Sequence, residues 1–221
     1  MIRIYLLLFL LFQCSVFSQT GFVSNINPKL KHLHAEVGTN IGVQSTEVFD
    51  YDLNIFLNQM LKESKTEIKC FSDFDFETLS DFRGFQDRKA TEYLDDFCKR
   101  KGVKDLIVFY RNNLFSLYSP YQNLFNLNFD FGILTQVRKK KTIYFMNRKL
   151  MAYYNSETKK LNLTRIGDNQ FKGEFIKINS KDAVVDKNNK LVNSESVQKD
   201  FINQYESYVR ANFMDALKNI N

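Results

Sequence analysis

Apolar side chains recur at helical spacing in three segments of the chain. In residues 53–61 they follow Asp52, which stands where the N-cap residue of a helix is expected. A second segment starts at Asp87 and ends in consecutive cations followed by Gly102, a residue that commonly terminates helices. The longest segment, 194–220, has one apolar face. This pattern predicts three helices, and the last of them must cover a sheet or meet a partner.

Strand patterns lie between and after these helices. TEIKCF (66–71) has strand length, and the continuous apolar run DLIVFYR (105–111) is typical of a strand buried on both faces. With a first short strand expected at 41–45, the order of elements predicts a βαβαβ opening and a partly parallel sheet. Aromatic and β-branched segments then alternate with the turn-like stretches SPYQN, RKKK and NSETKK, which predicts an antiparallel meander. These segments are 114–118, 127–137, 142–154 and 161–166, and a further short strand is expected at 174–178.

The predicted fold class is therefore α/β (α+β), with one mixed sheet, a βαβαβ opening, an antiparallel meander and a long C-terminal helix. Residues 19–40 show no clean period, so we expect a leader that packs loosely or pairs at an edge, followed by a single domain at 41–221. A chain of 221 residues can bury one core, and the 15% aromatic content with only 8 Gly and 2 Pro indicates packing rather than disorder.

Residues 1–18 have the pattern of an export signal. Arg3 is their only charge, and the apolar run behind it is shorter than the ~20 residues that span a bilayer as a helix. Cleavage after Ser18 fits the small residues that signal peptidase accepts, which predicts a periplasmic or secreted protein without a transmembrane span. The alternative is a lipid anchor on Cys14, although Gln13 stands where a lipoprotein signal has a small residue.

Two cysteines remain after such a cleavage, Cys70 and Cys98. In an oxidising compartment they could form a disulfide, and the equally weighted alternative is a pair of small core residues. The net charge of +6 is spread along the chain, which favours solubility and not nucleic-acid binding.

Asp73, Asp75 and Glu77 alternate with aromatic residues, so an extended backbone would turn all three carboxylates to one side. Such a set could hold a hard cation such as Ca²⁺ and serve a metal-dependent enzyme. A calcium loop would need Gly where Thr78 stands, and we favour a solvated acidic face with the aromatics turned inward.

His32 and His34 form an H-x-H pair that could supply two metal ligands from one strand face. They are the only histidines, and a surface pair is the favoured interpretation. The run Arg138, Lys139, Lys140 and Lys141 could contact lipid phosphate, another anion or a partner. A charged hairpin tip that discourages edge pairing is the favoured account of this run.

The aromatic residues of 109–154 could line a ligand groove, although core packing explains most of them. The chain lacks the G-x-S-x-G, G-x-x-x-x-G-K-[ST], G-x-G-x-x-G and Cys-x-x-Cys motifs. Common hydrolases, nucleotide enzymes and thiol oxidoreductases are therefore not expected. We predict no cofactor and no catalytic residue.

The stretch CKRKGVKDLIVFY (98–110), a helix end, Gly, short polar step and apolar strand, is followed later by LMAYYNSETKKLNLT (150–164). This order resembles bacterial envelope domains such as the TolB amino-terminal domain, the curli secretion lipoprotein and the outer-membrane activators of penicillin-binding proteins. The similarity covers residues 36–221. The chain departs from the pattern in its first strand and in Gly102-Val103-Lys104-Asp105, which replaces Gly-Ala-Asp, so no binding residue is carried over.

The resemblance implies a non-enzymatic role in envelope assembly, exercised by binding a protein partner. An alternative drawn from the residues themselves is a small-molecule or anion-binding module that uses the aromatic segments and the cations of 138–141. A second alternative is the metal-dependent enzyme built on Asp73, Asp75 and Glu77.

Overall fold

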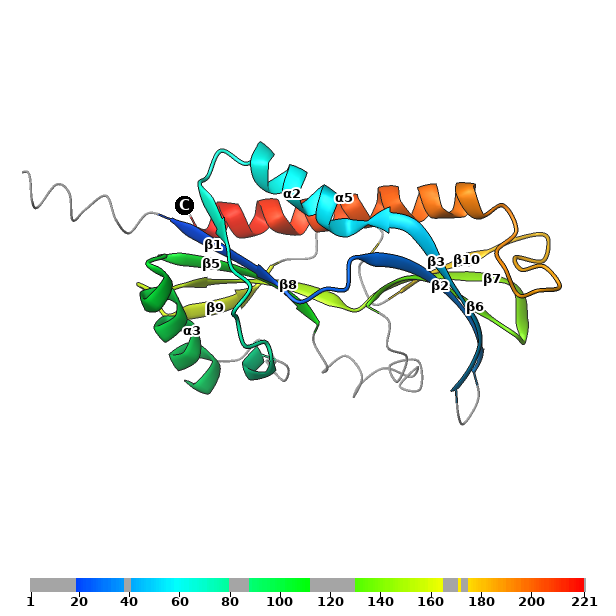
Figure 1. Ribbon diagram of the computed structural model, residues 1–221, viewed down its shortest axis with the longest axis horizontal. Coiled ribbons are helices and arrows are strands. Elements are labelled where there is room, and N and C mark those ends of the chain that lie inside the picture. The colour runs from blue at the N-terminus through cyan, green and yellow to red at the C-terminus, as the bar shows by residue number, and fades with distance from the viewer. Residues whose placement is uncertain are drawn as a thin grey trace, which may run out of the picture.

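Two five-stranded mixed sheets and three α-helices make up the part of the chain that the computed structural model describes (Figure 1). The described residues are 19–37, 41–79, 88–111, 130–164, 171 and 175–220. The α/β class is confirmed. The single sheet expected from the sequence is wrong, because the strands divide between two sheets.

The first sheet contains parallel strands, as expected, but the strand predicted at 41–45 is not one of them. Its order is β4 (Ile68–Cys70), β1 (Thr20–Ser24), β5 (Asp105–Arg111), β8 (Lys149–Asn155) and β9 (Lys160–Leu163). β1 is parallel to both β4 and β5, and the remaining pairs are antiparallel. Helix α3 (Arg88–Lys101) buries Ala90, Leu94, Phe97 and Cys98 against one face of this sheet, whereas Tyr93, the fifth residue of its predicted buried stripe, is half-buried.

The second sheet has the order β10 (Phe175–Asn179), β7 (Lys139–Asn147), β6 (Phe131–Gln136), β2 (Lys29–Val37) and β3 (Ile41–Asp52). β2 is antiparallel to β3 and parallel to β6, and the other pairs are antiparallel. The short strand expected at 41–45 is thus the start of a strand of 12 residues.

Residues 19–37 correct the prediction of a loose leader, because β1 and β2 each lie between two other strands. β1 is buried, and a Cβ on Gly21 would come within 2.8 Å of Leu106 Cδ1, so a larger residue there would require the packed Leu106 side chain to shift. In β2 the inward positions include His32 and His34, and these polar side chains interrupt the alternation of apolar and polar residues that would predict a strand. The domain therefore includes residues 19–37, which the sequence pattern assigns to a leader before it.

Helices α2 (Leu53–Glu63) and α5 (Ser194–Ile220) lie along the same side of the two sheets (Figure 1). The Asp52 carboxylate caps α2 as predicted, accepting the backbone N–H of Asn54 at 2.9 Å. Ile55, which we assigned to the buried stripe of α2, is instead 71% exposed. The predicted apolar face of α5 is buried against strands of both sheets, so one helix closes one shared core.

The antiparallel pairs of the meander are confirmed, but they belong to different sheets. Predicted segment 142–154 divides at Arg148, with β7 before it in the second sheet and β8 after it in the first. The turn predicted at NSETKK joins β8 to β9, and β10 is the strand expected at 174–178. Segment 114–118 and the SPYQN turn lie outside the described residues.

Asp130 lies where the chain passes from one sheet to the other. Its Oδ2 accepts the backbone N–H of Asn27 at 3.0 Å, and its backbone carbonyl accepts that of Arg148 at 3.0 Å. Its Oδ1 is 2.9 Å from the Nζ of Lys149, whose side chain is fully buried, and 3.7 Å from Nη1 of Arg111. Burial lowers the pKa of Lys149 to about 8, against the opposing effect of the Asp130 carboxylate.

Asp130→Asn is expected to lower the free energy of unfolding by about 3 kcal/mol, because it leaves the Lys149 ammonium buried without its anion. Adding Lys149→Met to that variant should recover most of the loss, since the buried ammonium that lacked an anion is then removed. Urea denaturation of the wild type and both variants measures the two differences. A single variant as stable as the wild type would contradict this role of Asp130.

Candidate functional site

The three acidic candidates do not converge on a metal site. Asp73 pairs with Lys101 at 2.6 Å, and Asp75 accepts the backbone N–H of Glu77 at 3.0 Å and the hydroxyl of Thr78 at 3.3 Å. No group of three or more His, Cys, Asp or Glu side chains among the described residues could hold a metal ion. The favoured interpretation, exposed acids with the aromatics turned inward, is confirmed. The described structure therefore gives no support to a metal site at these three carboxylates.

Both cysteines of the predicted pair are free thiols, so the disulfide considered for Cys70 and Cys98 is not formed in this structure. Cys98 lies fully buried on α3, where burial raises its pKa to about 12. Cys70 is exposed on β4, so the core interpretation holds for Cys98 alone.

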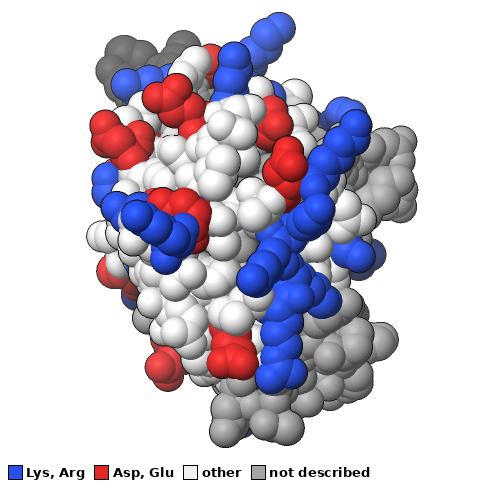
Figure 2. Space-filling view, turned by 90° about the vertical axis from the view of Figure 1, so that its right-hand side faces the viewer, with Lys and Arg blue, Asp and Glu red and all other residues white. Residues whose placement is uncertain are grey.

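The four consecutive cations do lie at a hairpin tip. Arg138 is in the turn between β6 and β7, and Lys139, Lys140 and Lys141 begin β7, all of them exposed. Arg138 contacts Glu36 at 3.4 Å, and the Lys139 ammonium donates to the Tyr144 hydroxyl at 3.0 Å. Figure 2, which views this end of the molecule, shows a band of Lys and Arg side chains along one side.

Most aromatic candidates that the structure describes belong to the core rather than to a groove. Tyr110, Phe131, Tyr144 and Tyr154 are buried. Three others, at positions 118, 121 and 125, lie outside the described residues.

β3 is the exposed margin of the second sheet. Among the described strands it pairs only with β2, and its 12 residues contrast with the 3 of β4, 4 of β9 and 5 of β10 at the other described margins. Val43 and Val48 on this strand are 47% and 61% exposed. A long strand with an unpaired edge is a template for adding another strand.

The two histidines are buried, so the expectation of a surface pair is wrong: His32 and His34 are 0% and 4% exposed. Strand alternation puts both on the side of the sheet that α5 covers, with Glu47 opposite His32 on β3 and Thr135 opposite His34 on β6. Only the strand pairing brings Glu47 and Thr135 to the histidines, which is why sequence reasoning missed them.

These four side chains form one hydrogen-bonded chain, called the histidine network below. His32 Nδ1 lies 2.6 Å from Oε2 of Glu47, and His32 Nε2 lies 2.8 Å from the Thr135 hydroxyl. His34 Nδ1 lies 2.8 Å from the same hydroxyl. Burial lowers the pKa of both histidines, with the Glu47 carboxylate opposing this for His32.

A loop of residues 180–193, the covering loop, lies over the network. Glu47 accepts the backbone N–H of Leu191 at 3.1 Å, and the Ser45 hydroxyl donates to the carbonyl of Asn189 at 3.0 Å. Between the loop and the hairpin end of the sheet is a cavity of about 360 Å³. Its lining includes His34 and Lys140 from the sheet and Asp186 and Lys187 from the loop.

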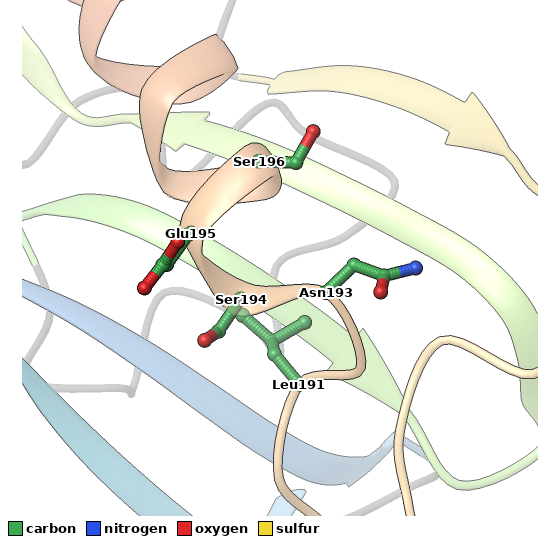
Figure 3. Close-up of a pocket in the computed structure, with 5 residues that line it drawn as sticks. All are labelled: Leu191, Asn193, Ser194, Glu195 and Ser196. Atoms are coloured by element: carbon green, nitrogen blue, oxygen red, sulfur yellow. The ribbon is translucent and has the colours of Figure 1, made fainter.

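A second, more open hollow of about 510 Å³ adjoins the start of α5 (Figure 3). The side chains of Asn193 and Ser196 point away from those of Ser194 and Glu195, so they do not converge on one point. The described residues that line the hollow include no cation. It offers less for a ligand than the cavity beside His34.

No protein-family model, curated protein or solved structure matches the chain. None of the helices in the described ranges combines the length and apolar character needed to cross a membrane.

Folding lowers the pKa of both histidines from 6.5, so just below that pH the unfolded chain binds more protons than the folded protein. The contribution of the two histidines to the free energy of unfolding is therefore expected to be complete above pH 6.5 and to be lost as the pH drops below it. Urea denaturation between pH 5 and 7 measures this, and the chain has only 2 histidines. His34→Gln should reduce the slope, and a flat wild-type profile would contradict burial of neutral histidines.

Proposed function

We propose that this protein is a secreted, non-enzymatic component of the bacterial envelope that binds a protein partner by strand addition at β3. The observation that carries the proposal is the 12-residue edge of that strand, with which no other described strand pairs. An extended segment of a partner can form main-chain hydrogen bonds with such an edge, while side chains on alternate positions provide specificity.

The composition of β3 favours pairing. Folded proteins protect sheet edges with Lys, Pro or very short strands, and residues 41–52 contain no Lys, Arg or Pro. Val48 and Thr46 are on the exposed side of the strand, and the inward positions Glu47 and Tyr51 are engaged by His32 and Glu206. Side chains on one face of β3 therefore hold the strand in place, while those on the other face are accessible to a partner.

Export is a separate part of the proposal and rests on the pattern of residues 1–18. A cut after Ser18 would leave β1 starting at the second residue of the new chain. Attachment through Cys14 would instead hold the domain near a membrane surface. The resemblance to envelope assembly domains supports a partner-binding role in either case.

The intact mass of protein recovered from its host tests the export step. The expected result is a chain that begins at Gln19, as cleavage after Ser18 requires. A mass that includes acyl chains on Cys14 would replace free secretion with lipid anchoring. Recovery of the uncut chain from the cytoplasm would contradict the envelope assignment.

A photo-crosslinking residue in place of Thr46 is expected to trap one specific partner protein in the host. Val48→Lys should abolish the adduct, because an edge lysine disfavours strand addition. The exposed site should change the free energy of unfolding by no more than about 0.5 kcal/mol.

Ile55→Lys is the matched control, since Ile55 is a 71% exposed apolar residue on α2 and not on the edge. It should leave the adduct intact. Loss of the adduct in both lysine variants, or absence of any adduct from position 46, would contradict binding at β3.

A further inference from the structure

The histidine network has one consistent arrangement of protons. A carboxylate only accepts hydrogen bonds, so His32 Nδ1 donates to Glu47. His32 in its neutral form then accepts at Nε2, which the Thr135 hydroxyl supplies with its single proton. The Thr135 oxygen is left to accept from His34 Nδ1.

This arrangement leaves a lone pair on Nε2 of His34. His34 lines the cavity, and its Nε2 makes no hydrogen bond with any residue in the described part of the chain. A proton added at Nε2 would break none of the network's hydrogen bonds, because every donor keeps its direction. The network thus holds His34 ready to change its charge without rearrangement.

The cavity has an excess of cations. Neither Lys140 nor Lys187 forms an ion pair with a described residue, and both line the cavity. Asp186 is the one described acid in the lining, and its Oδ1 already accepts the backbone N–H groups of Asn188 and Lys190 at 2.8 and 2.9 Å. A volume of about 360 Å³ is at the small end of ligand pockets.

We propose that this cavity binds a small oxyanion of the phosphate or sulfate class, held by Lys140 and Lys187, with one proton shared between the anion and Nε2 of His34. Ammonium groups bind such oxygens through charge-assisted hydrogen bonds. Hydrogen phosphate can donate its own proton to Nε2, whereas sulfate has none at neutral pH and requires His34 to take one from solvent.

Proton uptake sets the direction of the pH dependence. An anion favours the charged form of His34, so the pKa of His34 is higher in the complex than in the free protein. Sulfate affinity should rise as pH falls through the pKa of the complex and level off below that of the free protein. The charged or titratable groups around His34 are His32 and Glu47 through Thr135, Lys140 from β7, and Asp186 and Lys187 from the covering loop.

Calorimetric titration with inorganic phosphate and with sulfate tests the site. In buffers of different ionisation enthalpy, sulfate binding should take up protons and phosphate binding fewer. The double variant Lys140→Gln/Lys187→Gln is expected to weaken both affinities by about tenfold or more, since two charge-assisted contacts are lost.

Lys177→Gln provides the matched control, because Lys177 is an exposed lysine on β10 outside the cavity lining. It should bind both anions as the wild type does. No binding by the wild type, or equal weakening in the control and the double variant, would overturn the proposal. The photo-crosslinking at β3 does not depend on either anion, so the two proposals fail separately.

Nitrogen-15 spectra of the imidazole rings test the proton arrangement directly, because the chain has only 2 histidines. Near pH 7.5 both rings are expected as the neutral tautomer protonated at Nδ1, and sulfate should protonate Nε2 of His34 alone. Thr135→Val should uncouple His32 from His34 while leaving the lysines in place. A His34 ring protonated at Nε2 in the anion-free wild type would overturn the proposal.

Discussion

The contact between Asp130 and Lys149 is the constraint on which the two-sheet arrangement depends. Asp130 binds the backbone at two of the places where the chain changes sheet, at Asn27 and at Arg148, and it neutralises a fully buried ammonium. Without that anion the interior would contain an uncompensated charge at the point where the sheets join. The helix α5 packs on strands of both sheets and so extends across the same junction.

The protein contains two buried acid–base pairs, Lys149 with Asp130 and His32 with Glu47. The first pair supports the fold, whereas the second adjoins a candidate ligand site. The pKa of Lys149 is lowered only to about 8, so the ammonium stays mostly charged at neutral pH and holds the junction. His32 is kept neutral by burial despite its Glu47 contact, and its hydrogen bonds lead on to a second titratable ring beside a cavity. The second pair is thus linked to a ring that can take up a proton at Nε2 while each hydrogen bond of the network keeps its direction.

The elements that the sequence predicts well are those whose side chains repeat with one period. The 27-residue helix α5 was predicted with its observed bounds, and β5 is the buried strand expected from DLIVFYR. Strands β1 and β2 are not predicted from the sequence, because Gly21, His32 and His34 occupy inward positions where the strand pattern requires apolar residues. The division into two sheets is not predicted either, because the chain changes sheet at Arg148 and no glycine or proline marks that position. Neither Glu47 nor Thr135 could be linked to the H-x-H pair without the strand register.

β3 joins the two proposed binding sites. The Ser45 hydroxyl and the Glu47 carboxylate, both on this strand, bond to the backbone of the covering loop at Asn189 and Leu191. That loop supplies Lys187 to the cavity, and Glu47 ends the histidine network. A strand added to the outer edge acts on the same backbone that positions these groups. Any effect of the added strand on anion affinity must be matched by an equal effect of the anion on strand addition, since coupling between two sites is reciprocal.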